Sequence, residues 1–125
     1  DAFKVALFKA NASITGTYSA ATTNYSDMTG NSDELPATGG YSTTGFALTN
    51  VNPTSTSTTA FTSFSANASW TSATFTTRGC MIYNTSDSNS AVAVINFGAD
   101  YSVSGGTFEI QWPTADSSNA IIRIA

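Results

Sequence analysis

The acidic side chains are the residues of this chain that could most readily do chemistry. Asp27, Asp33 and Glu34 stand close together among Asn and Ser residues, so their oxygens could bind Ca²⁺. The D-x-D-x-D-G spacing of a calcium loop is missing, and the alternative is a solvated acidic loop. Two carboxylates could also cleave a glycosidic bond, but only their separation in space identifies such a pair. The acids therefore predict no metal site, and their spacing identifies no catalytic pair.

The other residues that usually carry catalysis are scarce. The sequence has no histidine, which removes the commonest general base and the usual Ser-His and Cys-His nucleophiles. The single cysteine, Cys80, lies in the apolar run Cys-Met-Ile-Tyr, which favours a buried and inert thiol. We therefore expect a protein that is not an enzyme and that uses no cofactor.

Arg78 is the most informative cation, because it falls within the strand-like run T-F-T-T-R-G-C-M-I-Y. Its side chain either lies outward over neighbouring Thr residues or pairs across a subunit interface with an acid such as Asp100 or Glu109. Only four cations oppose eight acids, giving a net charge of −4. Four scattered cations cannot follow a phosphate backbone, and no apolar stretch is long enough to span a bilayer. We expect neither a nucleic-acid nor a membrane partner.

The composition predicts one small β domain over residues 1–125. Charged residues make up only 10% of the chain, against about 25% in an average protein. Thr and Ser replace them, with 21 and 18 copies, and these residues suit half-exposed strands and turns. This balance is typical of an extracellular or particle-bound β protein.

The hydrophobic pattern predicts about eight short strands and one long loop. Alternation with period two favours strands, and helical periodicity is absent over any useful length. The loop spans residues 19–44, with at most a helical turn near 32–35, and is a candidate contact region. The expected strands cover residues 3–10, 14–18, 45–51, 59–69, 70–84, 91–98, 106–113 and 119–125. An antiparallel sandwich, a jelly roll and a closed barrel all fit this pattern.

Two of these segments carry a more detailed expectation. Residues 91–97 are apolar on both faces, which predicts a central strand that is covered on both sides. In the next segment Phe108, Ile110 and Trp112 should point inward, while Glu109 and Gln111 point outward.

The four C-terminal segments also carry a family resemblance. They read W-T-S-A-T-F-T-T-R-G-C-M-I-Y-N-T-S, A-V-A-V-I-N-F-G-A-D, G-T-F-E-I-Q-W-P-T-A-D and A-I-I-R-I-A. Here, and more loosely over residues 34–49, the chain resembles small virion structural proteins of tailed bacteriophages. The resemblance implies a capsid decoration or cement protein on the outside of the virion, with the major capsid protein as its partner. It carries no catalytic residue over to this chain.

The resemblance also implies a homotrimer, because decoration proteins commonly occupy three-fold positions. We expect aromatic anchors at subunit or capsid contacts, with Arg78 as a further interface candidate. Core packing is the alternative for each aromatic, and it is favoured for Trp112. The aromatic candidates are Tyr25, Tyr41, Phe46, Trp70 and Trp112.

Two other functions compete with decoration. A tail-fibre tip or host adhesin would recognise surface glycans, for which loop aromatics beside Asn and Asp offer stacking surfaces. A glycan-cleaving enzyme is the third possibility, and it would need a pair of the carboxylates named above.

Overall fold

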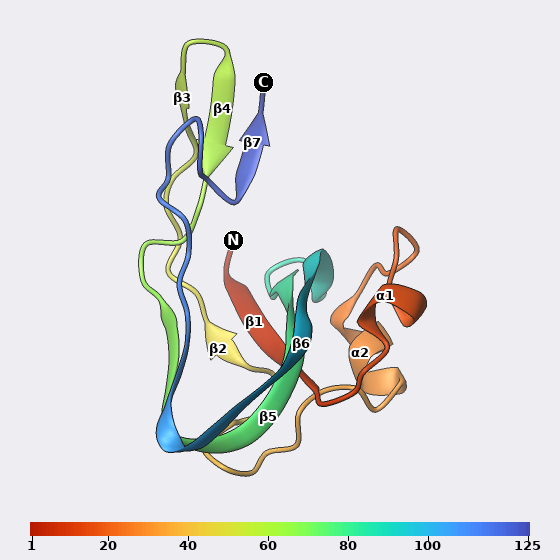
Figure 1. The fold of residues 1–125 in the computed structure, drawn as a ribbon. Helices are drawn as coiled ribbons and strands as arrows, with labels where there is room; N and C mark the ends of the chain where they lie inside the picture. Colours follow the sequence, from red (N-terminus) through yellow and green to blue (C-terminus); the bar gives the residue numbers. More distant parts are fainter.

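The computed structural model describes residues 1–125 and is built mainly from antiparallel strands (Figure 1). Strands hold 49% of the residues and helices 8%, which confirms the all-β class. A four-stranded sheet has the order β2-β1-β5-β6, and a three-stranded sheet has the order β3-β4-β7. The two antiparallel sheets are consistent with a sandwich, whereas a jelly roll is not confirmed. The strands are β1 (Phe3–Lys9), β2 (Phe46–Ala47), β3 (Thr54–Thr56), β4 (Thr59–Thr62), β5 (Ala68–Asn84), β6 (Ser90–Ile110) and β7 (Ile122–Ile124).

Strand β1 is central because it contributes to a hydrophobic cluster on each face of the four-stranded sheet. Val5 and Leu7 pack in one cluster, which includes Trp70 and Cys80. Ala6 and Phe8 pack in the other, together with side chains of β5 and of the helices. Phe8 departs from an alternation with one apolar face because its side chain is fully buried in the second cluster. Both faces of this strand therefore contribute to the core.

Residues 14–18 form a helical turn instead of the expected strand. Helix α1 (Ile14–Thr17) begins after Ser13, and the N–H of Tyr18 donates to the carbonyl of Ile14. Side chains four residues apart lie on the same face of a helix. Ile14 and Tyr18 are both buried in the second cluster, where the ring of Tyr18 meets Phe8 edge-on at 4.8 Å. Burial of this pair explains why the helix replaces the strand.

The long loop of residues 19–44 contains a second helix, α2 (Tyr25–Gly30), located before the helical turn expected near residues 32–35. Asn24 caps the helix, since its side chain accepts from the N–H of Ser26 at 2.9 Å. The carboxylate of Asp27 in turn accepts from the N–H of Asn24 at 3.2 Å. Met28 anchors the helix with a fully buried side chain. The local signal was therefore the Asn-x-x-Asp capping pair.

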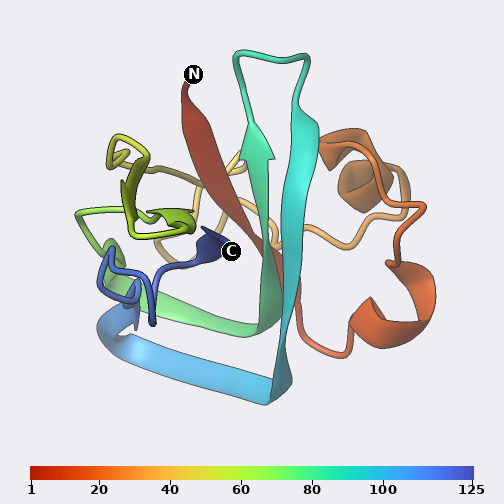
Figure 2. The same cartoon turned by 90° about the horizontal axis from the view of Figure 1, so that it is seen from above.

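Two of the expected C-terminal strands are one continuous strand. Segment 91–98 and the first part of segment 106–113 merge into β6, which ends at Ile110 and pairs with β5 in a long, sharply bent hairpin (Figures 1 and 2). The register shifts at several points, including between Thr77 and Gly79, and Gly98 has a φ of +83°. Bulges and glycines bend a strand without ending it. The turn-forming residues between the two expected segments therefore mark bends within one strand. Strand β6 also lies at the sheet edge, which corrects the expectation of a central strand, and Val92 is 41% exposed.

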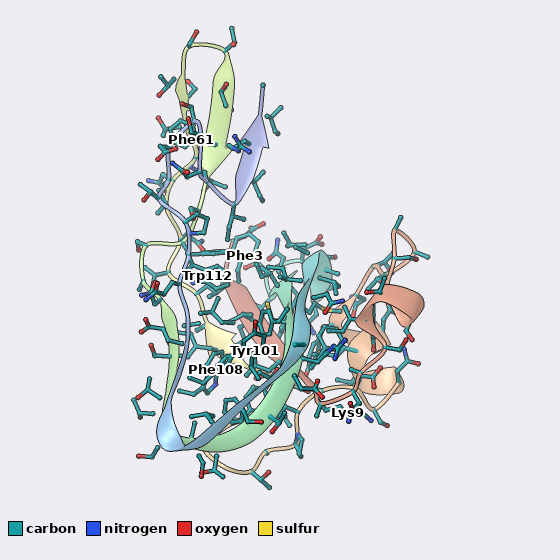
Figure 3. All side chains as sticks on the ribbon, viewed as in Figure 1. Phe3, Lys9, Phe61, Tyr101, Phe108 and Trp112 are labelled. Carbon is teal, nitrogen blue, oxygen red and sulfur yellow. The ribbon has the colours of Figure 1, made fainter.

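The three-stranded sheet projects from the body as an arm (Figure 1). The Thr-Ser run after Pro53 forms the β3–β4 hairpin, and β7 pairs with β4 on the other side. The expected strand over residues 59–69 ends at Thr62, and the one over 45–51 shrinks to the two residues of β2. Phe61 is the one buried residue in the strands of the arm, well away from Phe108 in the body (Figure 3). Neither α1 nor α2 is long and apolar enough to cross a membrane.

Candidate functional site

Glu34 is the centre of a polar cluster in which two tyrosine hydroxyls and one backbone N–H converge on its carboxylate. Its carboxylate accepts a hydrogen bond from the hydroxyl of Tyr25, another from Tyr41 at 2.8 Å and a third from the N–H of Thr44 at 2.8 Å. The hydroxyl oxygen of Tyr41 also accepts from the N–H of Leu7 at 3.1 Å. The Glu34 side chain thus connects α2 with the end of the long loop, and Tyr41 extends the connection to β1.

Thr44 is held in an unusual conformation beside this cluster. Its φ is +74°, which is rare for a β-branched residue. Tyr83 donates its hydroxyl to the Thr44 carbonyl at 2.5 Å, and Lys4 donates to the Thr44 hydroxyl at 2.9 Å. Together with Glu34, these side chains fix the backbone where the loop turns back toward β2.

The phenols of this region are donors with high pKa values. Burial raises the pKa of Tyr83 to about 12, and the charge of Glu34 adds to the effect. Burial also raises the pKa of Tyr25 and of Tyr41 well above the usual range. The rings of Tyr25 and Tyr83 are stacked with their centroids 4.5 Å apart. Neutral, rigidly held phenols of this kind stabilise structure rather than transfer protons near neutral pH.

Asp33 forms a second polar connection next to the first. Its carboxylate accepts from the hydroxyl of Tyr18 at 2.8 Å and lies 3.6 Å from the ammonium of Lys9. Asp33 and Glu34 are thus neither a solvated loop nor an arranged set of Ca²⁺ ligands. No group of three or more potential metal-ligating side chains comes together in the chain.

Arg78 pairs with Asp100 of the same chain, with 3.6 Å between guanidinium nitrogen and carboxylate oxygen. Asp100 is one of the two acids expected to pair with Arg78 across a subunit interface, whereas the contact seen here lies within one chain. The pair joins β5 and β6 at the bend of the hairpin, and Asp100 also accepts from the N–H of Asn11 at 3.1 Å. Both side chains are about one-third exposed, so the pair adds little stability of its own.

The structure distributes the aromatic interface candidates between core and surface. Tyr41 and Trp70 are 3% and 6% exposed and pack in the first cluster. Core packing was the alternative interpretation for both residues. They are therefore not available as surface anchors on the single chain. Tyr25 and Phe46 are partly exposed, and so is Arg78. Trp112 packs edge-on against Phe64 at 5.3 Å and, as expected, serves the core.

Sequence reasoning missed the large apolar side chains that the fold leaves exposed. They lie on β6 and β7, two strands at sheet edges. The only signal was the alternation of Ile with Arg123 in the last segment, which suggests one apolar face. The exposed side chains are those of Val92, Ile95, Tyr101, Ile122 and Ile124.

The buried thiol and phenols of the core predict a loss of stability at high pH. Burial raises the pKa of the Cys80 thiol from 9.0 to about 12, and those of Tyr18 and Tyr83 from 10.0 to about 12. Above pH 9 the unfolded chain releases these protons first, so it binds fewer protons than the folded chain and the free energy of unfolding falls. Urea midpoints at several values between pH 7 and pH 11 measure this, and Tyr18→Phe should make the decline less steep. A midpoint that stays constant to pH 11 would contradict the expectation.

Comparisons with known proteins identify no relative of this chain. No family model, curated protein or solved structure matches the chain.

Proposed function

We propose that this chain is a non-enzymatic structural protein of a tailed-bacteriophage virion. Its role is capsid decoration: it binds the major capsid protein on the outside of the particle, as a homotrimer, and stabilises the lattice. The resemblance of the C-terminal segments to virion proteins supports this proposal, and so does the confirmed all-β class.

One observation carries the proposal: every carboxylate side chain of the protein is already bonded within the chain. The Glu34 and Asp33 contacts hold the long loop against the sheet, and Asp100 holds the bend of β5 and β6. The remaining five acids cap turns or bridge strands in the same way. Acidic side chains that all make hydrogen bonds or ion pairs within the chain favour a rigid scaffold over a site for acid–base chemistry.

Copy number on the particle tests the proposal. Decoration of a capsid lattice requires hundreds of copies, because the protein occupies a repeated position. Purified particles that contain this chain should be measured by gel densitometry or quantitative mass spectrometry against the major capsid protein. A dozen copies or fewer would overturn decoration and place the protein at the tail.

A tail position would favour the second candidate, a module that binds host glycans. A shallow hollow on β6 supports it, since Tyr101, Phe97 and Phe108 line this hollow beside Glu109. Tyr101 is 52% exposed. An exposed ring next to a carboxylate is a suitable arrangement for stacking and hydrogen bonding to a sugar.

A further inference from the structure

The arm formed by β3, β4 and β7 has one face on which Phe61 is covered, although Thr54 and Arg123 are exposed there, and one open face. The register between β4 and β7 pairs Phe61 with Arg123, and it pairs Ala60 with Ile124. Residues directly opposite each other in an antiparallel sheet project to the same side, and neighbours along a strand project to opposite sides. Phe61 is 7% exposed on the covered side, whereas Ile122 and Ile124 are 40% and 69% exposed on the other.

The open face continues into a groove at the base of the arm. The groove has a volume of about 390 Å³, and its apolar walls include Phe64 from the arm side and Val92 from β6. Ile122 belongs to both the groove and the open face. The 14 groove residues and three more from the arm sheet (Ser55, Ala60 and Ile124) form one surface of 17 residues, which we name the arm face.

We propose that the arm face is the surface through which copies of this chain associate with one another. Each copy presents a projecting strand with two exposed isoleucines, and each has an apolar groove at the foot of the same strand. The projecting strand of one copy fits the groove of the next, a head-to-tail contact that closes into a ring.

The charge distribution favours a second copy as the occupant. Asp1 is the one residue of the arm face with an ionisable side chain, and its carboxylate already accepts from the amide of Asn84 at 2.8 Å. The chain has a net charge of −4, so two copies repel wherever their acids meet. A face without free acids avoids this repulsion. A partner recognised by opposite charge would instead find almost no charge to bind.

The extent of the surface also fits association between proteins. A standard interface uses about 20–30 residues on each side. All residues of the arm face except the buried Ser63 and Ile82 are at least partly exposed, so the arm face has the extent of a small interface. Within the strands of the arm only Phe61 is buried, so the arm gains little from its own packing. Cover from a neighbouring copy would supply the apolar contacts that a three-stranded sheet needs.

This inference deepens the proposed function, because it rests on the proposed homotrimer and locates its contacts. The test requires only the isolated chain, in sedimentation velocity or light scattering after gel filtration at about 1–100 µM. The unmodified chain should be oligomeric. Asp at both Ile122 and Ile124 (I122D/I124D) should weaken association at least about 30-fold, the effect of removing a central interface anchor. Asp at both Ile95 and Tyr101 (I95D/Y101D) is the matched control, since it adds the same two charges at exposed apolar sites outside the arm face and should leave association unchanged.

Cross-linking gives a readout that does not depend on the stability of the double variant. Cys80 is buried, so Ile124→Cys provides a single accessible thiol on the arm face. A short bifunctional maleimide should join copies of the Ile124→Cys chain, and it should not join copies of Tyr101→Cys. A monomeric unmodified chain at 100 µM, or association that survives I122D/I124D, would overturn the inference. Copy number on the particle is measured separately, so a failure of self-association can be distinguished from a failure of capsid decoration.

Discussion

Replacing Glu34 with alanine should lower the free energy of unfolding by about 3–5 kcal/mol, since hydrogen bonds to a charged group contribute about 1.5–3 kcal/mol each. The substitution leaves two tyrosine hydroxyls and the N–H of Thr44 without their acceptor. Tyr41 is 3% exposed, so water reaches its hydroxyl poorly. Thr44 also loses a contact that holds its positive φ. For a chain of this size the melting temperature should fall by about 10–20 °C.

Two further variants separate the hydrogen bonds from a general effect of charge. Glu34→Gln keeps one carbonyl oxygen as an acceptor, so its loss should be smaller, about 1–2 kcal/mol. Glu109→Gln changes the charge by the same amount on an exposed carboxylate and should shift the melting temperature only slightly. Differential scanning calorimetry of the three variants measures these differences. Equal losses for Glu34→Ala and Glu109→Gln would contradict a structural role for the Glu34 cluster.

Gly45→Ala should lower the free energy of unfolding by more than about 3 kcal/mol, the range of large steric and backbone effects. Gly45 follows Thr44 and has a φ of +81°. A Cβ atom there would lie 2.0 Å from the carbonyl oxygen of Val5 and 2.8 Å from the Cα of Ala6. These are backbone atoms of the central strand β1, so they cannot move aside without disturbing the sheet. The neighbouring β1–β2 pairing should be lost in this variant.

Gly98→Ala is the matched control, because it isolates the cost of the backbone angle. Gly98 has a φ of +83°, and a Cβ atom there would meet nothing within 4 Å. Its loss should be about 1–2 kcal/mol, as for an unobstructed left-handed residue. Urea unfolding of the two variants provides the comparison. Similar losses at both positions would show that the contact with β1 has no consequence.

The sequence determined the fold class because the β signals were strong and local. Alternation up to Leu7 identified the opening strand, and Phe108 and Ile110 pointed inward as expected and packed with the first cluster. The helical turn at Ile14 could not be distinguished from a strand, since the residues that select it lie in β1 and β5. The merger of two segments into β6 was equally hard to predict. A glycine such as Gly98 can mark either the end of a strand or a bend within it.

The candidate site was less accessible to sequence reasoning than the fold. The acids at positions 33 and 34 stood out, but their partners Tyr18, Tyr25 and Tyr41 are set by tertiary packing. Tyrosines in a long loop suggested surface anchors, yet a phenol beside a carboxylate serves the interior equally well. The arm face escaped notice for the opposite reason, since Ile122 and Ile124 come from a segment that is apolar enough to belong in a core.

The pairing of β4 with β7 gives the molecule an uneven distribution of local stability. This contact joins residues about sixty positions apart in the chain through three residue pairs, whereas β5 and β6 are adjacent and pair along most of their length. Closing so long a loop for so few bonds is unfavourable, so the arm opens in fluctuations that leave the sheet of β1 and β5 intact. Its amide protons would exchange with solvent far sooner than those of the body. A neighbour that covers the arm would therefore change its dynamics more than its shape.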